Sequence, residues 1–280
     1  MKFTNYNRLW NQITATKKAG KHFSTSIKES KVHVNGQTIN YVKVGEGPKN
    51  VLCFPGALGT IWSDFKPQIE QLDKNKFTVI AWDPPGYGHS RPPDRLFNLD
   101  FYTSDAEVAY NFLKEINVDK FSLLGWSDGG ISSLILAAKY PKNVDKLVVW
   151  GANAYVVPKD IEAFESIRDL NKWSDKMKAP LIQLYTERGL QSMWNNWCDT
   201  MIQIHERGGD ICKSCLAKIE SDTLILHGDQ DPMVLNEHPE YLLNHIKNAK
   251  LHRYPDGKHN IHLKYAKDFN KIVSDFIVSN

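Results

Sequence analysis

Long apolar stretches are missing from this 280-residue sequence. No uninterrupted run approaches the ~18–20 apolar residues that a membrane-spanning helix requires, and no secretory signal with a hydrophobic centre is visible. We therefore expect a soluble protein without a membrane partner. The hydrophobic content of 41% is nevertheless large enough to build one substantial core in a chain of this length.

Cysteine is scarce as well, with four residues in the whole chain. Cys53, Cys198, Cys212 and Cys215 are too few and too unevenly spaced to form a disulfide framework. Cys212-Lys-Ser-Cys215 has the spacing of half a zinc site or of a redox pair, but no second cysteine pair and no suitably spaced histidine pair completes it. We expect reduced thiols, no bound metal and no cofactor.

Acidic residues are absent before Glu29, whereas the first 28 positions carry six basic residues and many Ser, Thr and Asn. This composition is typical of a mitochondrial presequence. We therefore expect a leader over 1–28 and a mitochondrial location; the alternative is a short disordered leader on a cytoplasmic protein. Without the leader, 29 basic residues face 32 acidic ones, a charge of −3. The body has no basic excess that would indicate nucleic-acid binding.

Apolar runs that end in turn residues recur along the body of the chain, and helical patterns separate them. Strands that alternate with helices require a mostly parallel sheet covered on both faces. Near the start, residues 31–34 and 39–44 alternate around Asn35-Gly36, which predicts a β-hairpin at the sheet edge. The other predicted strands are 50–54, 77–82, 120–124, 146–150, 222–227 and 250–254.

The alternation stops between 155 and 218, where tryptophan-rich, helix-like segments follow one another without an intervening strand. We therefore predict an α/β core over 29–154 and 219–280, with a helical cap inserted at 155–218. Such an insertion lies above the C-terminal edge of the sheet, where α/β proteins bind ligands. We expect the cap to shape the substrate pocket; packing for stability alone is the alternative.

The stretch Gly125-Trp-Ser-Asp-Gly129 ends an apolar strand and precedes a helical segment. A sharp turn between a strand and a helix exposes a serine hydroxyl, and flanking glycines leave room for neighbouring elements. Ser127 is therefore the candidate nucleophile. Because Gly-x-Ser-x-Gly also occurs by chance in loops, other parts of the chain must decide between the two interpretations.

A serine hydroxyl needs an imidazole base, and the imidazole needs a carboxylate that fixes its tautomer. Asp231 and His259 follow the last two predicted strands and can fill these roles. Asp229 and His262 compete with them. Asp231 reaches further into its loop and precedes a proline, and His259 directly follows a strand and a turn, so we favour Asp231 and His259.

Longer strings accompany the serine turn, and they are far more specific than the turn itself. They are Ala-Trp-Asp-Pro at 81–84, Gly-Tyr-Gly-His-Ser-Arg-Pro-Pro-Asp-Arg at 86–95, Trp-Gly-Ala-Asn-Ala-Tyr at 150–155 and Gly-Lys-His-Asn at 257–260. With these strings and the order Ser127, Asp231, His259, the sequence resembles the α/β-hydrolase family from about Phe23 to the C-terminus.

The resemblance has specific implications for fold and function. It implies an α/β-hydrolase fold, with a mostly parallel central sheet flanked by helices and an inserted helical cap. It also implies a serine hydrolase that cleaves α-amino-acid esters, with Asp231 as the acid of the triad. No redox cofactor and no catalytic metal is implied.

Two backbone amides are expected to form an oxyanion hole. The residue after the nucleophile donates its N–H there, so Asp128 is the first expected donor. The second donor is expected from Ala57 or Leu58, which lie in the glycine-rich exit of a predicted strand. The sequence does not distinguish these two residues, and a simple turn is the other interpretation of this segment.

The side chain of Asp128 needs a separate explanation. A carboxylate beside a developing oxyanion disfavours that charge unless it points away or is neutralised by a cation. The α-ammonium group of an amino-acid ester lies one carbon from the carbonyl under attack and can neutralise it. The resemblance gives Asp128 this ammonium-binding role; the alternative is that Asp128 favours the positive end of the following helix.

We therefore expect a monomeric enzyme that acts on a small-molecule ester through an acyl-enzyme. A second hypothesis is hydrolysis of other esters, lactones or carbon–carbon bonds with the same triad. A third is a receptor that binds its ligand without turnover.

Overall fold

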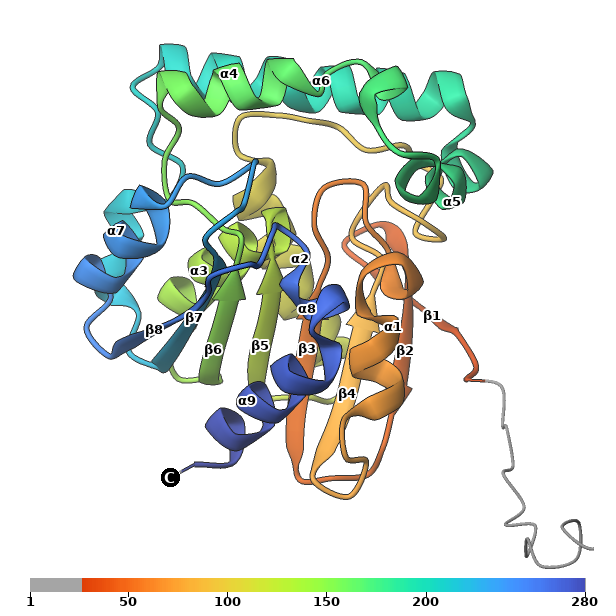
Figure 1. Cartoon of the computed structure of the whole chain (residues 1–280). Coiled ribbons are helices and arrows are strands. Elements are labelled where there is room, and N and C mark those ends of the chain that lie inside the picture. Colours follow the sequence, from red (N-terminus) through yellow and green to blue (C-terminus); the bar gives the residue numbers. More distant parts are fainter. Residues whose placement is uncertain (1–26, 280) are drawn as a thin grey trace, which may run out of the picture.

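The computed structural model describes residues 27–279 of the chain. The predicted leader at 1–28 lies almost wholly outside this range, so its mitochondrial role stays a prediction. The described residues form an eight-stranded sheet in the order β1-β2-β4-β3-β5-β6-β7-β8 (Figure 1). The strands are β1 (Ser30–Val34), β2 (Gln37–Val44), β3 (Lys49–Phe54), β4 (Phe77–Trp82), β5 (Phe121–Trp126), β6 (Val144–Trp150), β7 (Asp222–Gly228) and β8 (Ala249–Tyr254).

The sheet is mostly parallel, as the sequence predicted. The pairs from β4 through β3, β5, β6 and β7 to β8 are all parallel. The β1–β2 and β2–β4 pairs are antiparallel. The hairpin turns at Asn35-Gly36, with Val34 opposite Gln37. Antiparallel pairing is therefore confined to one edge, and the expected mostly parallel central sheet is confirmed.

Helices cover both faces of this sheet. Because successive strand residues point to opposite faces, Leu52 and Phe54 of β3 pack in one core, while Val51 and Cys53 pack in the other. The helices of this part are α1 (Ile61–Gln71), α2 (Phe101–Glu115), α3 (Asp128–Lys139), α7 (Glu237–His245), α8 (Ile261–Lys264) and α9 (Ala266–Val278). Among residues 27–279, no helix has the length and apolar character needed to cross a membrane.

The segment between β6 and β7 is helical. It contains α4 (Pro158–Ser166), η1 (Leu170–Lys172), α5 (Asp175–Tyr185), α6 (Glu187–Glu206) and η2 (Lys213–Lys218). In Figure 1, α4 and α6 lie across one end of the sheet, beyond α2 and α3. The predicted helical insertion is present and lies at the side of the sheet where the candidate site is found.

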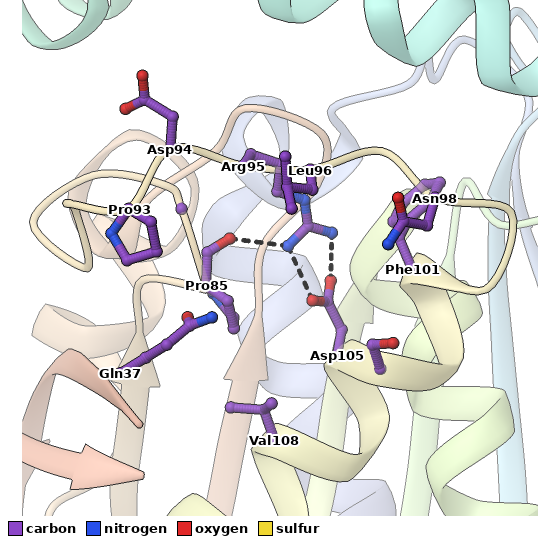
Figure 2. Close-up of a pocket in the computed structure, with 12 residues that line it drawn as sticks. Gln37, Pro85, Pro93, Asp94, Arg95, Leu96, Asn98, Phe101, Asp105 and Val108 are labelled. Carbon is purple, nitrogen blue, oxygen red and sulfur yellow. Dashed lines mark hydrogen bonds and ion pairs between the residues drawn. The ribbon is translucent and has the colours of Figure 1, made fainter. Parts of the chain in front are cut away.

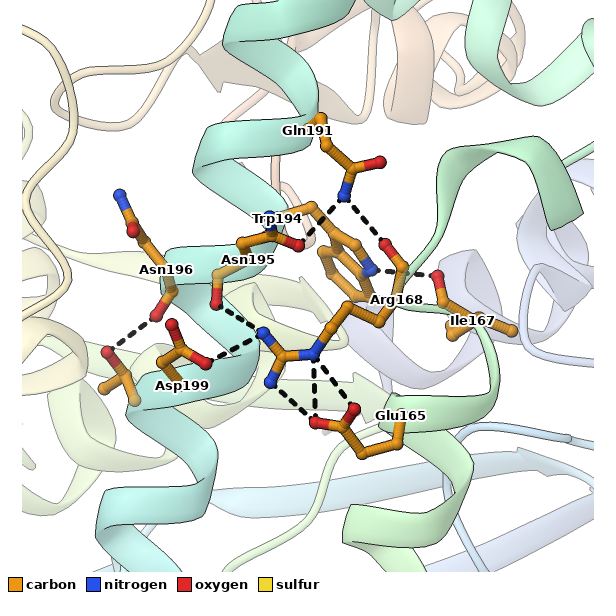
Figure 3. Close-up of polar contacts among 9 residues, drawn as sticks. Glu165, Ile167, Arg168, Gln191, Trp194, Asn195, Asn196 and Asp199 are labelled. Atoms are coloured by element: carbon orange, nitrogen blue, oxygen red, sulfur yellow. Dashed lines mark hydrogen bonds and ion pairs between the residues drawn. The ribbon is translucent and has the colours of Figure 1, made fainter.

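Polar contacts fix the helices of the cap to one another. The Arg168 guanidinium, just after α4, contacts Glu165 at 2.6 Å and Asp199 of α6 at 2.8 Å. The indole N–H of Trp194 donates to the Ile167 carbonyl at 3.0 Å. Figure 3 shows these contacts between α4 and α6. The cap therefore has its own network of hydrogen bonds and ion pairs.

The base of the cap is tied to the core. Tyr155 and Asp210, at the two ends of the insertion, form an isolated antiparallel bridge. His238 of α7 lies 3.0 Å from both carboxylate oxygens of Asp160, in the first turn of α4, and both side chains are buried. These contacts hold the start and the end of the cap together and fix the first cap helix to the core.

A buried ion pair fixes the loop between β4 and α2 (Figure 2). Arg95 donates through Nη1 to Asp105 Oδ1 at 2.8 Å and through Nη2 to Oδ2 at 2.5 Å. Nη1 also donates to the Pro85 carbonyl at 2.9 Å. The guanidinium lies 4.5 Å from the centre of the Tyr87 ring. Both charged residues line a pocket of about 190 Å³ between this loop, Gln37 of β2 and the first turns of α2.

Asp105→Ala is expected to lower the free energy of unfolding by about 3–5 kcal/mol, because it leaves the Arg95 charge buried and uncompensated. Urea unfolding followed by circular dichroism measures the change. Asp119→Ala is the matched control, since it breaks an exposed ion pair with Lys114 and should change stability little. Equal losses in the two variants would contradict a special contribution from the buried pair.

Candidate active site

Ser127 lies at the turn between β5 and α3. Its φ of 55° and ψ of −122° are unfavourable for a residue that has a Cβ. The turn is packed closely against the end of β3: a Cβ on Gly129 would lie 2.1 Å from the Phe54 carbonyl oxygen. The Ser127 N–H donates to the Trp150 carbonyl at 3.0 Å. Strand β6 and the end of β3 therefore hold the strained serine in place.

The structure brings Ser127, His259 and Asp231 together. His259 Nε2 lies 3.1 Å from Ser127 Oγ, and His259 Nδ1 lies 2.8 Å from Asp231 Oδ2. The other oxygen, Oδ1, accepts the N–H groups of Met233 at 2.8 Å and Val234 at 3.1 Å. These contacts connect the carboxylate, the imidazole and the hydroxyl in one chain of hydrogen bonds.

Asp231 and His259 each stabilise the charged form of the other. Burial opposes ionisation of Asp231, but His259 and the two amides outweigh it and lower the pKa of the carboxyl group. Burial also opposes protonation of His259, but Asp231 outweighs it and raises the pKa of the imidazole. An imidazolium formed during proton transfer is therefore stabilised by a carboxylate that stays ionised.

The competing candidates lie elsewhere. Asp229 pairs with Arg253 at 2.5 Å. His262 is fully buried in α8, where its Nδ1 accepts the indole N–H of Trp150 at 2.9 Å. Burial lowers the pKa of His262 to about 3, so this imidazole is neutral at physiological pH. Neither side chain forms a hydrogen bond with Ser127 within the described part of the chain.

Ala57 and Leu58 lie in the loop after β3, beside the serine. A Cβ placed on the preceding Gly56 would lie 3.2 Å from the Cβ of Ser127. Leu58 has a φ of 62°, and its carbonyl accepts the Tyr185 hydroxyl at 3.0 Å. Within residues 27–279, the N–H groups of Ala57 and Asp128 donate to no backbone or side-chain acceptor, and the Leu58 N–H lies close to the Tyr87 hydroxyl. Both Ala57 and Leu58 remain candidate donors to a substrate oxygen.

The Asp128 carboxylate is buried and turned toward α2 and the cap. Its Oδ1 accepts the Tyr102 hydroxyl at 2.8 Å, and its Oδ2 accepts the indole N–H of Trp197 at 2.8 Å. Burial raises the pKa of Asp128 to about 6, against the hydrogen bonds from both donors and the charge of Arg95. The carboxylate thus points away from its own backbone amide and is bound by two neutral donors.

Tyr102 and Trp197 are site residues that sequence reasoning missed. Tyr102 is on α2 and Trp197 is on cap helix α6, at separations of 26 and 69 residues from Asp128. The unusual density of tryptophan in the cap was visible in the sequence, but no local motif connects either residue to an acid. Their role depends on the tertiary arrangement of the cap above α3.

The described residues contain no cluster of three or more His, Cys, Asp or Glu side chains arranged to hold a metal ion. All four cysteines carry free thiols. Cys215 Sγ lies 3.1 Å from the Cys212 carbonyl oxygen. The pair therefore forms one turn at the base of the cap.

Comparisons with known proteins identify the family of this chain. A family model described as the alpha/beta hydrolase fold matches residues 49–200 and 162–265. Serine hydrolase BPHL from Mus musculus is 46% identical over 256 residues, covering 91% of this chain and 88% of the relative. A more distant relative, 2-hydroxy-6-oxononadienedioate/2-hydroxy-6-oxononatrienedioate hydrolase of Escherichia coli (strain K12), is 25% identical over 85% of this chain and 90% of its own length.

Solved structures share the fold at low sequence identity. The 2-hydroxy-6-oxo-6-phenylhexa-2,4-dienoate hydrolase from Rhodococcus sp. strain RHA1 has a TM-score of 0.76 at 19% identity, covering 90% of this chain and 99% of that structure. The family model and the 46% identity to BPHL assign the chain to the same family, and the solved structures share its fold. The chain belongs to the α/β-hydrolase family and, within it, to the serine hydrolases of the BPHL type.

Proposed function

We propose that this serine hydrolase cleaves esters of α-amino acids and holds the substrate ammonium group with Asp128. The observation that carries the proposal is a buried carboxylate directly after the candidate nucleophile. Among the described residues, no Lys, Arg or His side chain forms an ion pair with Asp128. A buried carboxylate without a paired cation is costly, and a cationic substrate relieves that cost.

The proposed reaction begins at Ser127. His259 takes the hydroxyl proton as Oγ attacks the ester carbonyl, and the same imidazole then protonates the leaving alcohol. An acyl-enzyme results, and His259 next activates water, which releases the acid. Asp231 stabilises the imidazolium in both steps. The Asp128 N–H and an N–H of Ala57 or Leu58 receive the carbonyl oxygen as its charge develops.

The proposed ammonium site follows from the free capacity of the Asp128 side chain. Each carboxylate oxygen accepts one hydrogen bond from a neutral donor among the described residues, whereas a carboxylate has about four acceptor positions. An α-ammonium group can therefore bind without displacing Tyr102 or Trp197. A charge-assisted hydrogen bond of this kind also orients the carbonyl carbon toward Ser127.

A matched pair of esters tests the proposal. L-phenylalanine ethyl ester and ethyl 3-phenylpropanoate have the same alcohol and the same phenyl group and differ in the α-ammonium. We expect kcat/KM to be about 10–100-fold higher for the amino-acid ester, as for one hydrogen bond to a charged group. Equal values would contradict ammonium recognition. Faster cleavage of a vinylogous diketone than of either ester would favour carbon–carbon bond hydrolysis.

The pH dependence of this preference is a separate prediction. Since burial raises the pKa of Asp128 to about 6, its carboxylate is present above this pH and is lost as the pH falls through it. The substrate ammonium is lost near pH ~7.7. The ratio of kcat/KM for the two esters should therefore peak between these values and fall on both sides. Protonation of His259 affects both esters alike and cancels in the ratio; a flat ratio from pH 5 to 9 would contradict the proposal.

A further inference from the structure

Asp64 of α1 is a buried carboxyl group that directly contacts the loop beside Ser127. Its Oδ2 accepts the Gly56 N–H at 3.0 Å, and its Oδ1 accepts the Ser63 hydroxyl at 2.6 Å. The residue is 5% exposed. This carboxyl group therefore links the start of helix α1 to the loop that contains Ala57 and Leu58.

The contact is not needed to cap the helix. Thr60 and Ser63 form a capping box at the N-terminus of α1, and the Ile61 N–H donates to Asp83 Oδ1 at 2.9 Å. These residues already accept the Ile61 and Ser63 amides of the first turn. Asp64 instead directs its carboxyl group back to the chain segment that precedes the helix.

Residues 56–59, which we call the oxyanion loop, fold around this carboxyl group. The Gly59 N–H donates to the Gly56 carbonyl at 3.1 Å and closes the turn. A Cβ on Gly59 would lie 1.9 Å from Asp64 Oδ2, so the carboxyl oxygen occupies the space beside that glycine. Between the two glycines, Leu58 adopts a φ of 62°, which is unfavourable for a residue with a Cβ. The loop needs such contacts to keep this shape.

We propose that Asp64 is a positioning residue for the oxyanion loop: its carboxylate binds the Gly56 N–H and thereby aims the amide of Ala57 or Leu58 at the substrate carbonyl oxygen. The inference rests on the proposed acyl transfer through Ser127 and is independent of ammonium recognition. Asp64 touches no reacting atom and acts through the backbone.

The groups around Asp64 make its charge sensitive to pH. Burial raises the pKa of Asp64 to about 7, against the hydrogen bonds from Ser63 and Gly56; Asp83 raises it further and His259 lowers it. Tyr185 faces this carboxyl group and His262 faces the Asp64 backbone; both stay neutral, since burial raises the pKa of Tyr185 and lowers that of His262. Protonation of Asp64 replaces a charge-assisted hydrogen bond to Gly56 by a weaker one.

Two variants at position 64 test the role, with a neutral ester such as ethyl 3-phenylpropanoate as substrate. Asp64→Ala removes the acceptor for the Gly56 N–H and should lower kcat by about 10²–10³-fold, the loss expected when an oxyanion-hole donor is misplaced, with KM little changed. Asp64→Asn keeps a neutral acceptor oxygen toward Gly56, as protonated Asp64 does, and should recover only part of the lost kcat. Ser63→Ala removes the other partner of the carboxyl group and should cause a much smaller loss than Asp64→Ala.

The pH profile provides a readout that a purely structural role would not move. In the wild type, protonation of Asp64 should lower kcat by about the factor that separates the wild type from Asp64→Asn, so log kcat should fall toward acid pH more steeply than the slope of one that belongs to His259 alone. Asp64→Asn should leave the slope of one that belongs to His259. If Asp64→Ala does not fold, this comparison of wild type and Asp64→Asn decides alone, and identical slopes overturn the proposal.

The reactive sites are counted by end-point labelling of Ser127 with a fluorophosphonate, and kcat is expressed per labelled site. Wild-type kcat per site retained in Asp64→Ala overturns the positioning role while acyl transfer stands. A wild-type protein that neither cleaves the ester nor reacts with the fluorophosphonate overturns acyl transfer itself, and the positioning role with it.

Discussion

Ser127→Ala is expected to lower kcat for ester hydrolysis by about 10⁴–10⁶-fold, because no other group can form the acyl-enzyme once the hydroxyl is gone. The imidazole of His259 lies 3.1 Å from this hydroxyl, and among the described residues its Nε2 contacts no other hydroxyl or thiol. Initial rates with a neutral and a cationic ester, measured at equal enzyme concentration, provide the test. Labelling by a fluorophosphonate should disappear in the same variant.

His259→Ala should give a loss of similar size, since serine and histidine act as a unit and their effects do not add. The double variant is therefore expected to be no slower than either single one. Unchanged circular dichroism excludes unfolding as the cause. Substantial activity left in Ser127→Ala would require a different nucleophile, and an unlabelled, inactive but folded wild type would favour a receptor.

Asp128→Asn is expected to lower kcat/KM for L-phenylalanine ethyl ester by about 10–100-fold, the size of the wild-type preference, and to change the value for ethyl 3-phenylpropanoate by less than about threefold. The substitution keeps the backbone N–H of the proposed oxyanion donor and removes the negative charge that we propose attracts the ammonium. The quantity to measure is the ratio of kcat/KM for the two esters, which should fall close to one.

Trp197→Phe is the matched control for Asp128→Asn. An asparagine cannot accept from both Tyr102 and Trp197 through two oxygens, so part of any loss comes from a broken hydrogen bond. Trp197→Phe breaks the 2.8 Å bond to Oδ2 and leaves the carboxylate in place. The ester preference should survive in Trp197→Phe near neutral pH; equal loss of preference in both variants would show that geometry, and not charge, matters.

The position of the triad could be predicted because each member follows a strand. In a parallel sheet the C-terminal ends of strands meet at one edge, so Ser127 after β5, Asp231 after β7 and His259 after β8 were expected near one another. The choice between Asp231 and Asp229 rested on loop reach, and the structure pairs Asp229 with Arg253 instead. The order of these residues along the chain was enough to predict that they meet, because the backbone topology alone brings them together.

Contacts made by side chains across elements were beyond the sequence. Nothing in the pattern connects Asp64 to the amide of Gly56, because an acid in the first turn of a helix is equally typical of a favourable helix-dipole interaction. Helix α7 (Glu237–His245) was also missed, since it buries little apolar surface and only His238, Pro239 and Leu242 are buried in it. Backbone donors such as Ala57 and Leu58 leave no side-chain signal at all.

The cap donates hydrogen bonds to two parts of the candidate site. Trp197 donates to the Asp128 carboxylate, and the Tyr185 hydroxyl donates to the Leu58 carbonyl in the oxyanion loop. The cap is therefore not an interchangeable module that selects substrates by shape alone. A chimaera that received the cap of a distant relative would lose both anchors unless the transplanted helices brought equivalents of Tyr185 and Trp197. A redesign of substrate specificity should therefore keep Tyr185 and Trp197 and vary the other residues of the cap helices.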